Sequence, residues 1–278
     1  MRIVTFLSCC CAAMAMHAKE SVMFVGAHPD DSEGFAATAF LLKDKYDIHV
    51  VDVTRGERGF GLRGFYDGTT GARRVAEEYD ACALLGATPH FLCEKDSIAI
   101  ASQESIDALA RLIRDVNPKA IFTHWPVDVH TDHAMTAAIV AGEMSQARSR
   151  PAELYYFEVL RSQTKNYRPL YSVDVSATMT NKVEMLRRYV CQNGNDKLVR
   201  QKLQQAEERG AERSPAVAYA ETFTTFDGKP ISDGVLEKLP ETTIIPAGHA
   251  SAAPRPSTAT CETQSARVSP AMQKSACR

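Results

Sequence analysis

The sequence predicts an α/β fold, a Rossmann-like three-layer sandwich with a mostly parallel sheet in a single domain. Two observations lead to this prediction. Short apolar or β-branched segments alternate with segments of helical composition up to Pro151, and this order is typical of a parallel sheet covered by helices. The chain has 278 residues, of which 45% are hydrophobic and 24% are charged, so it can build one such domain with a full core.

The alternation begins at residue 21 with a short apolar strand. The segment 69–86 is the clearest helix, because Thr69 or Thr70 can cap its start and Gly86 is placed to end it. The segment 102–118 is amphipathic, with apolar side chains at helical spacing. The predicted strands of this part are 21–27, 48–54, 90–94 and 119–125, and the predicted helices are 34–45, 69–86, 102–118 and 132–147.

After Pro151 the alternation loosens, although further elements are predicted. The strands are 153–159 and 171–176, the helices are 178–191 and 196–209, and 216–226 is a last extended segment. From Pro246 onward the chain is rich in Ala, Ser, Thr and Pro and shows no apolar period. We therefore expect a folded domain over 19–245 and a flexible C-terminal tail over 246–278.

The first residues have the outline of a secretory signal. One arginine precedes a short apolar run, Ile3 to Ala15, which ends in small residues and is too short to span a bilayer. We expect residues 1–18 to be a signal peptide, which makes the mature protein periplasmic or secreted, without stable membrane insertion. The alternatives are a lipoprotein anchor on one of Cys9 to Cys11, or a disordered or strand-forming start of a cytosolic protein.

Charge and cysteine content exclude several classes of function. The formal net charge is −2 and no block of Lys and Arg stands out, so nothing indicates binding to nucleic acid or to an anionic membrane. The cysteines that remain after removal of the signal contain no C-x-x-C pair, which argues against a structural zinc cluster. We expect a small molecule or a glycan as the ligand.

Three polar segments follow predicted strands directly. They are "HPDDSE" (28–33), "RGERG" (55–59) and "HWPVDVHTDH" (124–133). In an open parallel sheet, ligands bind outside the carboxyl ends of the strands. The three segments, far apart in sequence, are therefore expected to converge on one edge of the sheet.

The residue types in these segments suit a catalytic metal. His28, Asp31 and His133 offer two imidazoles and one carboxylate, which is a catalytic zinc arrangement, although such ligands also suit Fe(II), Co(II) or Mn(II). Asp30, next to the ligands, is the candidate general base that takes a proton from water. His130 can face the same cavity and stabilise a developing oxyanion.

Each motif alone has a simpler explanation. An Asp-Asp pair before a helix can cap it, and short strings of Asp and His are mostly solvated loops. The metal site is predicted because both segments lie at predicted strand ends. Asp128 and Asp132 are the candidates for holding His130 and His133 in the correct tautomer, and the role of His124, at the same edge, stays open.

Four motifs in this order resemble a known family. "AHPDDSE", "TRGERG", "RRVAEEYDACALLGA" and "THWPVDVHTDH" are similar to the PIG-L/LmbE-like family of zinc-dependent N-acetylglucosaminyl deacetylases, over about residues 21–226. By the family's pattern, His28, Asp31 and His133 match the zinc ligands. Asp30 matches the general base, and His130 matches the residue that assists at the oxyanion.

The resemblance also implies residues on the substrate side. Arg74 falls on the family's "R-x-x-E" helix, whose arginine lines the substrate pocket. Arg55, in the "TRGERG" loop, is expected to face the sugar. We also place Asp128 on the substrate side.

The implied reaction is hydrolysis of an amide. Metal-activated water, with Asp30 as general base, would remove the acetyl group from N-acetylglucosamine or from a glycan or conjugate that contains it. One alternative is an amidase that acts on another N-acyl or thiol-sugar conjugate. A second alternative, of a different class, is a non-catalytic protein that binds metal and sugar. Dinucleotide binding lacks support, because no G-x-G-x-x-G follows the first strand.

Overall fold

The secondary structure follows the predicted order of strands and helices. The computed structural model describes residues 19–59, 68–146, 152–193, 196–240 and 243–246. The strands are β1 (Glu20–Gly26), β2 (Tyr46–Thr54), β3 (Thr88–Glu94), β4 (Ala120–His124), β5 (Glu153–Phe157), β6 (Tyr171–Asp174), β7 (Ala220–Thr224) and β8 (Ile244–Pro246). The helices are α1 (Ala36–Leu42), α2 (Thr70–Leu85), α3 (Gln103–Val116), α4 (Thr131–Gln146), α5 (Met179–Leu186) and α6 (Lys197–Ala211), and a short 3₁₀ helix, η1 (Asp31–Gly34), joins β1 to α1.

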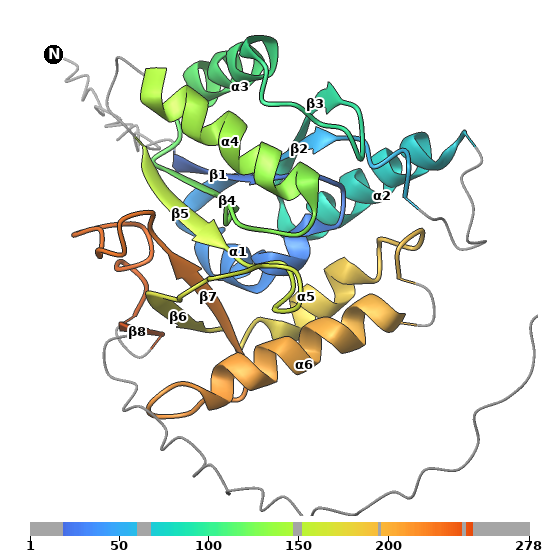
Figure 1. Ribbon diagram of the computed structural model, residues 1–278. Coiled ribbons are helices and arrows are strands. Elements are labelled where there is room, and N and C mark those ends of the chain that lie inside the picture. The colour runs from blue at the N-terminus through green and yellow to red at the C-terminus, as the bar shows by residue number, and fades with distance from the viewer. Residues whose placement is uncertain (1–18, 60–67, 147–151, 194–195, 241–242, 247–278) are drawn as a thin grey trace, which may run out of the picture.

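The described strands form one sheet in the order β3-β2-β1-β4-β5-β7-β6-β8. β1 to β5 pair in parallel with one another, whereas β7 pairs antiparallel with β5 and β6, and β6 pairs antiparallel with β8. In Figure 1, α3 and α4 lie above the sheet, and α5 and α6 lie below it. The predicted Rossmann-like sandwich with a mostly parallel sheet is therefore confirmed.

The side chains of β1 face the two helical layers alternately. Val22 and Phe24 share a core cluster with residues of α1, α2, α5 and α6, whereas Met23 and Val25 share one with residues of α3 and α4. Successive side chains of a strand point to opposite faces. A strand covered on both sides therefore needs an unbroken apolar run, and this explains why residues 21–27 read as a buried strand.

Two elements differ from the prediction. The strand β8 was not expected, because it has three residues and exists through its pairing with β6. The helix predicted over 178–191 ends at Leu186. Beyond it, the N–H groups of Arg188 and Tyr189 donate to carbonyl groups three residues earlier, and the Tyr189 side chain turns inward, where its hydroxyl lies 2.8 Å from Ser32 Oγ.

The predicted terminal segments are not tested by this structure. Residues 1–18, the expected signal peptide, and residues 247–278 of the expected tail lie outside the described residues. Pro246, the first residue of that tail, is the last residue of β8. Among the described helices, none combines the length and the apolar character needed to cross a membrane. Export therefore stays a prediction.

The strand order creates one reversal point in the parallel part of the sheet. From β1 the chain continues to β2 and β3 on one side, and then to β4 on the other side of β1. The loops that leave the carboxyl ends of β1 and β4 therefore diverge, and a crevice opens between them. His28 and Asp31 follow β1, and His130 and His133 follow β4, so the candidate residues meet at this crevice.

Candidate active site

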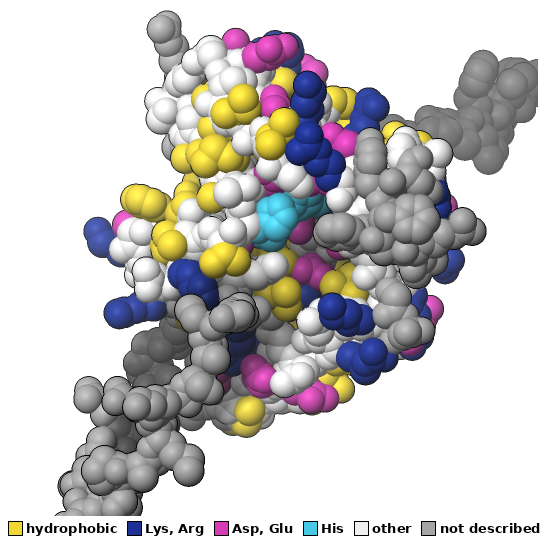
Figure 2. Space-filling model, turned by 45° about the vertical axis from the view of Figure 1, so that its right-hand side comes forward, with side chains coloured by type: hydrophobic (Ala, Val, Ile, Leu, Met, Phe, Trp, Pro, Cys, Tyr) yellow, Lys and Arg dark blue, Asp and Glu magenta, His cyan; other side chains and the backbone are white. Residues whose placement is uncertain are grey.

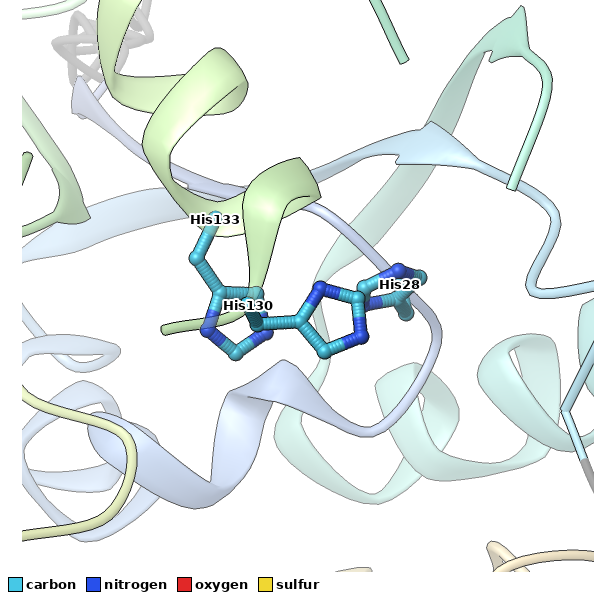
Figure 3. Close-up of side chains that lie close together, drawn as sticks. All are labelled: His28, His130 and His133. Carbon is cyan, nitrogen blue, oxygen red and sulfur yellow. The ribbon is translucent and has the colours of Figure 1, made fainter. Parts of the chain in front are cut away.

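The three histidines predicted for the site lie close together. His28 comes from the turn after β1, His130 directly precedes α4, and His133 lies in the first turn of α4 (Figure 3). The ring centroids of His28 and His130 are 4.7 Å apart, and those of His130 and His133 are 4.6 Å apart. The fold therefore brings together residues that are about 100 positions apart in the sequence.

Asp31 occupies the centre of this group and has one oxygen fixed. The backbone N–H groups of Ala27 and His28 donate to its Oδ2 at 2.7 Å and 2.9 Å. The Nε2 atom of His124, the last residue of β4, lies 3.0 Å from the same oxygen. The other oxygen, Oδ1, lies 3.5 Å from His133 Nε2, so it is the oxygen that remains available to a ligand.

Each of the two imidazoles has one nitrogen beside a carboxylate and the other nitrogen facing Asp31. His28 Nε2 lies 3.0 Å from Asp132 Oδ2 and 3.3 Å from Asp96 Oδ1, which leaves Nδ1 directed at Asp31, 3.6 Å from Oδ2. His133 Nδ1 lies 3.3 Å from Asp128 Oδ1, which leaves Nε2 toward Asp31. Carboxylates that hold the outer nitrogen of a ligating histidine are typical of metal sites.

This pairing corrects one detail of the sequence-based prediction. Asp128 and Asp132 were expected to orient His133 and His130. Asp128 does face His133, but Asp132 faces His28. The reason is that Asp132 lies in the first turn of α4, with the backbone N–H groups of Ser97 and Ala99 donating to it, so its carboxylate points toward the loop after β3.

The donor set fits a divalent transition metal. Ligands at 2.0–2.1 Å from a tetrahedral zinc ion lie about 3.3 Å from each other. This is close to the 3.5 Å from His133 Nε2 to Asp31 Oδ1 and to the 3.6 Å from His28 Nδ1 to the other oxygen, Oδ2. Among the described residues, three overlapping groups have all their ligand atoms within 4.8 Å: His28, His130 and His133; Asp31, His124 and His133; and His28, Asp96 and Asp132. The predicted trio is divided between these groups, and these ligand types do not distinguish zinc from iron, cobalt or manganese.

The charges of the buried groups depend on one another. Burial would raise the pKa of Asp31, but His124 and His133 hold it well below its usual value. Burial would lower the pKa of His133, but Asp31 and Asp128 raise it to about 9. Burial and the adjacent His133 lower the pKa of His124 to about 4. An anionic carboxylate is therefore buried in a place where positive charge compensates it.

Asp30 sits beside the donor set in an unusual backbone conformation. Its φ angle is 112°, a region that residues other than glycine rarely adopt. Its carboxylate pairs with the guanidinium of Arg74, which also donates to the carbonyl groups of Pro29 and Gly56. Burial, against the opposing effect of Arg74, raises the pKa of Asp30 to about 7.

A cavity of about 360 Å³ opens above these residues. Its lining includes all five residues predicted for the metal and the chemistry, and it includes Arg74. Arg55 does not line it, because its side chain is exposed and its Nη2 donates to Cys93 Sγ. Asp128 lies behind His133, with the N–H of His130 and the hydroxyl of Thr164 donating to it. Of the three residues expected on the substrate side, the structure thus brings one to the cavity.

The sequence comparison agrees with this geometry. Residues 23–142 match the family described as PIG-L, GlcNAc-PI de-N-acetylase. This part of the chain is a PIG-L domain. The resemblance seen in the sequence motifs is thereby confirmed.

The relatives of this PIG-L domain include enzymes of two kinds. The 4-oxalmesaconate hydratase of Pseudomonas putida KT2440 is 26% identical over 230 residues, or 76% of this chain and 88% of the relative. The structure of N,N'-diacetylchitobiose deacetylase from Pyrococcus horikoshii matches at 22% identity with a TM-score of 0.66, and covers 77% of this chain and 88% of that one. The structure of 4-carboxy-2-hydroxymuconate hydratase from Pseudomonas putida KT2440 also matches at 22% identity with a TM-score of 0.66. This match covers 77% of this chain and 98% of the hydratase chain. At these identities the structural matches show the shared fold.

Three residues of the PIG-L domain site were not predicted from the sequence. His124 stacks on His133 with ring centroids 4.2 Å apart, and its place at the end of a predicted strand was the available signal. Asp96 follows β3 by two residues, so the same strand-end rule could have found it. Arg58 lines the cavity in place of Arg55, and no signal in the sequence separates these two arginines.

Proposed function

We propose that the protein is a metal-dependent hydrolase that removes the acetyl group from N-acetylglucosamine or from a glycan or conjugate that contains it. One observation carries the proposal. His28 and His133 each have one ring nitrogen beside a carboxylate of a neighbour and the other facing an oxygen of Asp31, and Asp30 lies beside them in the same cavity. The match to a family described as a de-N-acetylase supports it.

The residues around the centre have the properties that amide hydrolysis needs. When bound by His28, Asp31 and His133, a divalent metal supplies a Lewis acid that polarises the acyl carbonyl and makes water more acidic. Asp30, with a pKa raised to about 7 by burial, can take the proton of the attacking water and return it to the departing amine. Arg74 holds the Asp30 carboxylate in position through its ion pair.

His130 is placed to stabilise the oxygen on which negative charge develops. Burial and the neighbouring His133 lower the pKa of His130, so its imidazole is neutral at pH 7 and keeps one N–H to donate. Its Nδ1 atom is buried and has no hydrogen-bond partner among the described residues. One such donor is typically worth about 10²–10³ in turnover.

The size and lining of the cavity support a sugar-sized substrate. Its volume of about 360 Å³ lies in the range of small-molecule sites, roughly 300–1,000 Å³. The side chains of Ser97, Gln163, Gln192 and Gln201 also line it, and their hydroxyl and amide groups suit the hydroxyl groups of a carbohydrate. The apolar part of the lining includes Val159 and Leu160.

A hydratase is the second candidate, because the 26% identical curated relative carries that name. The same base could add water to a carbon–carbon double bond instead of an amide. The experiment is to incubate the metal-loaded protein with a panel of N-acyl amino sugars and with conjugated unsaturated carboxylic acids. We expect acetate release that a chelator abolishes and one divalent metal restores. If no acetate forms and the absorbance of a conjugated acid disappears instead, the protein is a hydratase.

A further inference from the structure

The charged side chains that line the cavity are paired, with two exceptions. Each acidic side chain of the lining has a basic partner: Asp30 pairs with Arg74, Asp31 with His124, Glu33 with Lys202, and Asp96 with His28. Two cations of the lining, Arg58 and Lys197, form no side-chain hydrogen bond or ion pair with any described residue. These two cations are therefore the charged side chains of the lining that stay available to a ligand.

Arg58 and Lys197 come from two separate parts of the fold. Arg58 lies in the loop after β2, and its backbone N–H donates to Asp96 Oδ2 at 2.7 Å, which anchors the loop beside His28. Lys197 is the first residue of α6. Both side chains are exposed, so each can reach a ligand without leaving another partner. Figure 2 shows Lys and Arg side chains both above and below the exposed histidine on this face.

Neutral donors add to this part of the cavity. Gln163, Gln192 and Gln201 line it together with the two cations. The Nε2 atom of Gln192 is buried and has no hydrogen-bond partner among the described residues. A ligand group that accepts several hydrogen bonds and carries negative charge suits a lining of such donors and cations.

We infer that the substrate carries an oxyanion, a phosphate or a carboxylate, on the part of the molecule away from the acetamido group, and that Arg58 and Lys197 bind it. The inference rests on the proposed function in one respect: the hydrolysed amide is placed at His28, Asp31 and His133. Arg58 can meet such a group with two parallel N–H donors, and Lys197 acts as a point charge. The two residues thus select charged conjugates over neutral sugars.

The test measures binding of deacetylated sugars, which cannot react, to the metal-loaded full-length protein. Glucosamine 1-phosphate and muramic acid are the phosphate and carboxylate probes, and methyl glucosaminide is the neutral probe. We expect at least one anionic probe to bind about tenfold or more tightly than the neutral one, and added salt to reduce the difference. Arg58→Gln and Lys197→Gln should each remove most of this preference and leave the affinity for the neutral probe unchanged.

The matched control is Lys229→Gln, which removes the same charge from a side chain that is 80% exposed and outside the cavity. It should keep the preference. Equal binding of the three probes to the wild-type protein, or a preference that survives in the double variant, would overturn the inference. Acetate release, measured separately, distinguishes the two proposals. Anion-selective binding without any acetate release contradicts the proposed function alone, and acetate release without anion selectivity contradicts this inference alone.

Discussion

At the scale of single residues, each metal-binding candidate depends on a neighbour. Asp132 and Asp128 face the outer nitrogens of His28 and His133, and two backbone N–H groups hold one oxygen of Asp31. These contacts fix the orientation of each ring and of the carboxylate before any metal arrives. A buried group of acids and histidines is tolerated here because opposite charges and hydrogen bonds compensate it.

The carboxylates behind the histidines should contribute to metal affinity. Asp132→Asn and Asp128→Asn each keep the shape of the side chain but remove the charge that holds the imidazole. We expect each variant to bind the metal about 10- to 100-fold more weakly, measured by competition with a chelator of known affinity. Asp80→Asn, an exposed aspartate of α2, is the control. Unchanged affinity in both variants would show that these carboxylates do not support the ligands.

At the scale of elements, a buried ion pair connects helix α6 to η1, the 3₁₀ helix that begins with Asp31. The Nζ of Lys202, in α6, lies 3.0 Å from Glu33 Oε1 in η1, and it also donates to the carbonyl of Val159. Both side chains of the pair are almost fully buried. Since α6 also supplies Lys197 and Gln201 to the cavity, the pair joins one wall of the cavity to the metal site.

Breaking this buried pair should destabilise the fold. In Lys202→Met the carboxylate of Glu33 stays buried without its cation, which typically costs about 3–5 kcal/mol. The free energy of unfolding, from denaturant titration of the metal-free protein, should fall by this amount. The double variant Glu33→Gln/Lys202→Met should recover part of the loss, because no unpaired charge remains. The single variant Glu33→Gln completes the comparison. If the losses of unfolding free energy in Lys202→Met and Glu33→Gln simply add in the double variant, the pair is not coupled.

Outside the active site, a pair of histidines connects β2 to the neighbouring strand β3. His49 Nδ1 lies 3.0 Å from His90 Nε2. Burial lowers the pKa of His49, against the effect of Asp47, and burial together with His49 lowers the pKa of His90. When the pH falls below the usual histidine pKa of about 6.5, these two histidines therefore bind more protons in the unfolded chain than in the folded protein. The pair contributes stability above pH 6.5 and loses it as the pH falls.

This sign predicts how the pair affects thermal unfolding. The Tm of the wild-type protein minus that of His49→Gln/His90→Gln should decrease as the pH falls from 8 to 5. Both proteins are compared in metal-free form. Because they share the same active site, its titration cancels in the difference between their Tm values. A difference in Tm that stays constant with pH would contradict the lowered pKa values.

At the scale of the whole molecule, the local pattern of the sequence predicted the parallel half of the fold. Continuous apolar runs and amphipathic segments are visible in short windows, and β1 to β4 with α1 to α4 follow them closely. The strand β8 and the early end of α5 depend on pairing with β6 and on the burial of Tyr189. Such contacts join distant parts of the chain, and no short window contains them.

The same distinction applies to the site. The rule that strand ends converge placed His28, Asp31 and His133 together, because the topology alone determines it. The direction of a side chain in a loop depends on the local turn, so the sequence did not separate Arg58 from Arg55. It also did not pair Asp132 with His28. The fold determines where the cluster lies, and the loops determine which residues complete it.

The most direct test of the account compares the adjacent aspartates 30 and 31. Asp31→Asn should lose metal, because a neutral amide is a poorer ligand than a carboxylate. Asp30→Asn should keep the metal and nearly unchanged KM, but lose most of kcat, because an amide cannot accept the proton of water. The measurement is metal content, kcat and KM for acetate release by both variants and the wild-type protein. Full metal content in Asp31→Asn, or near-wild-type turnover by metal-loaded Asp30→Asn, would contradict the roles that the structure supports for these two residues.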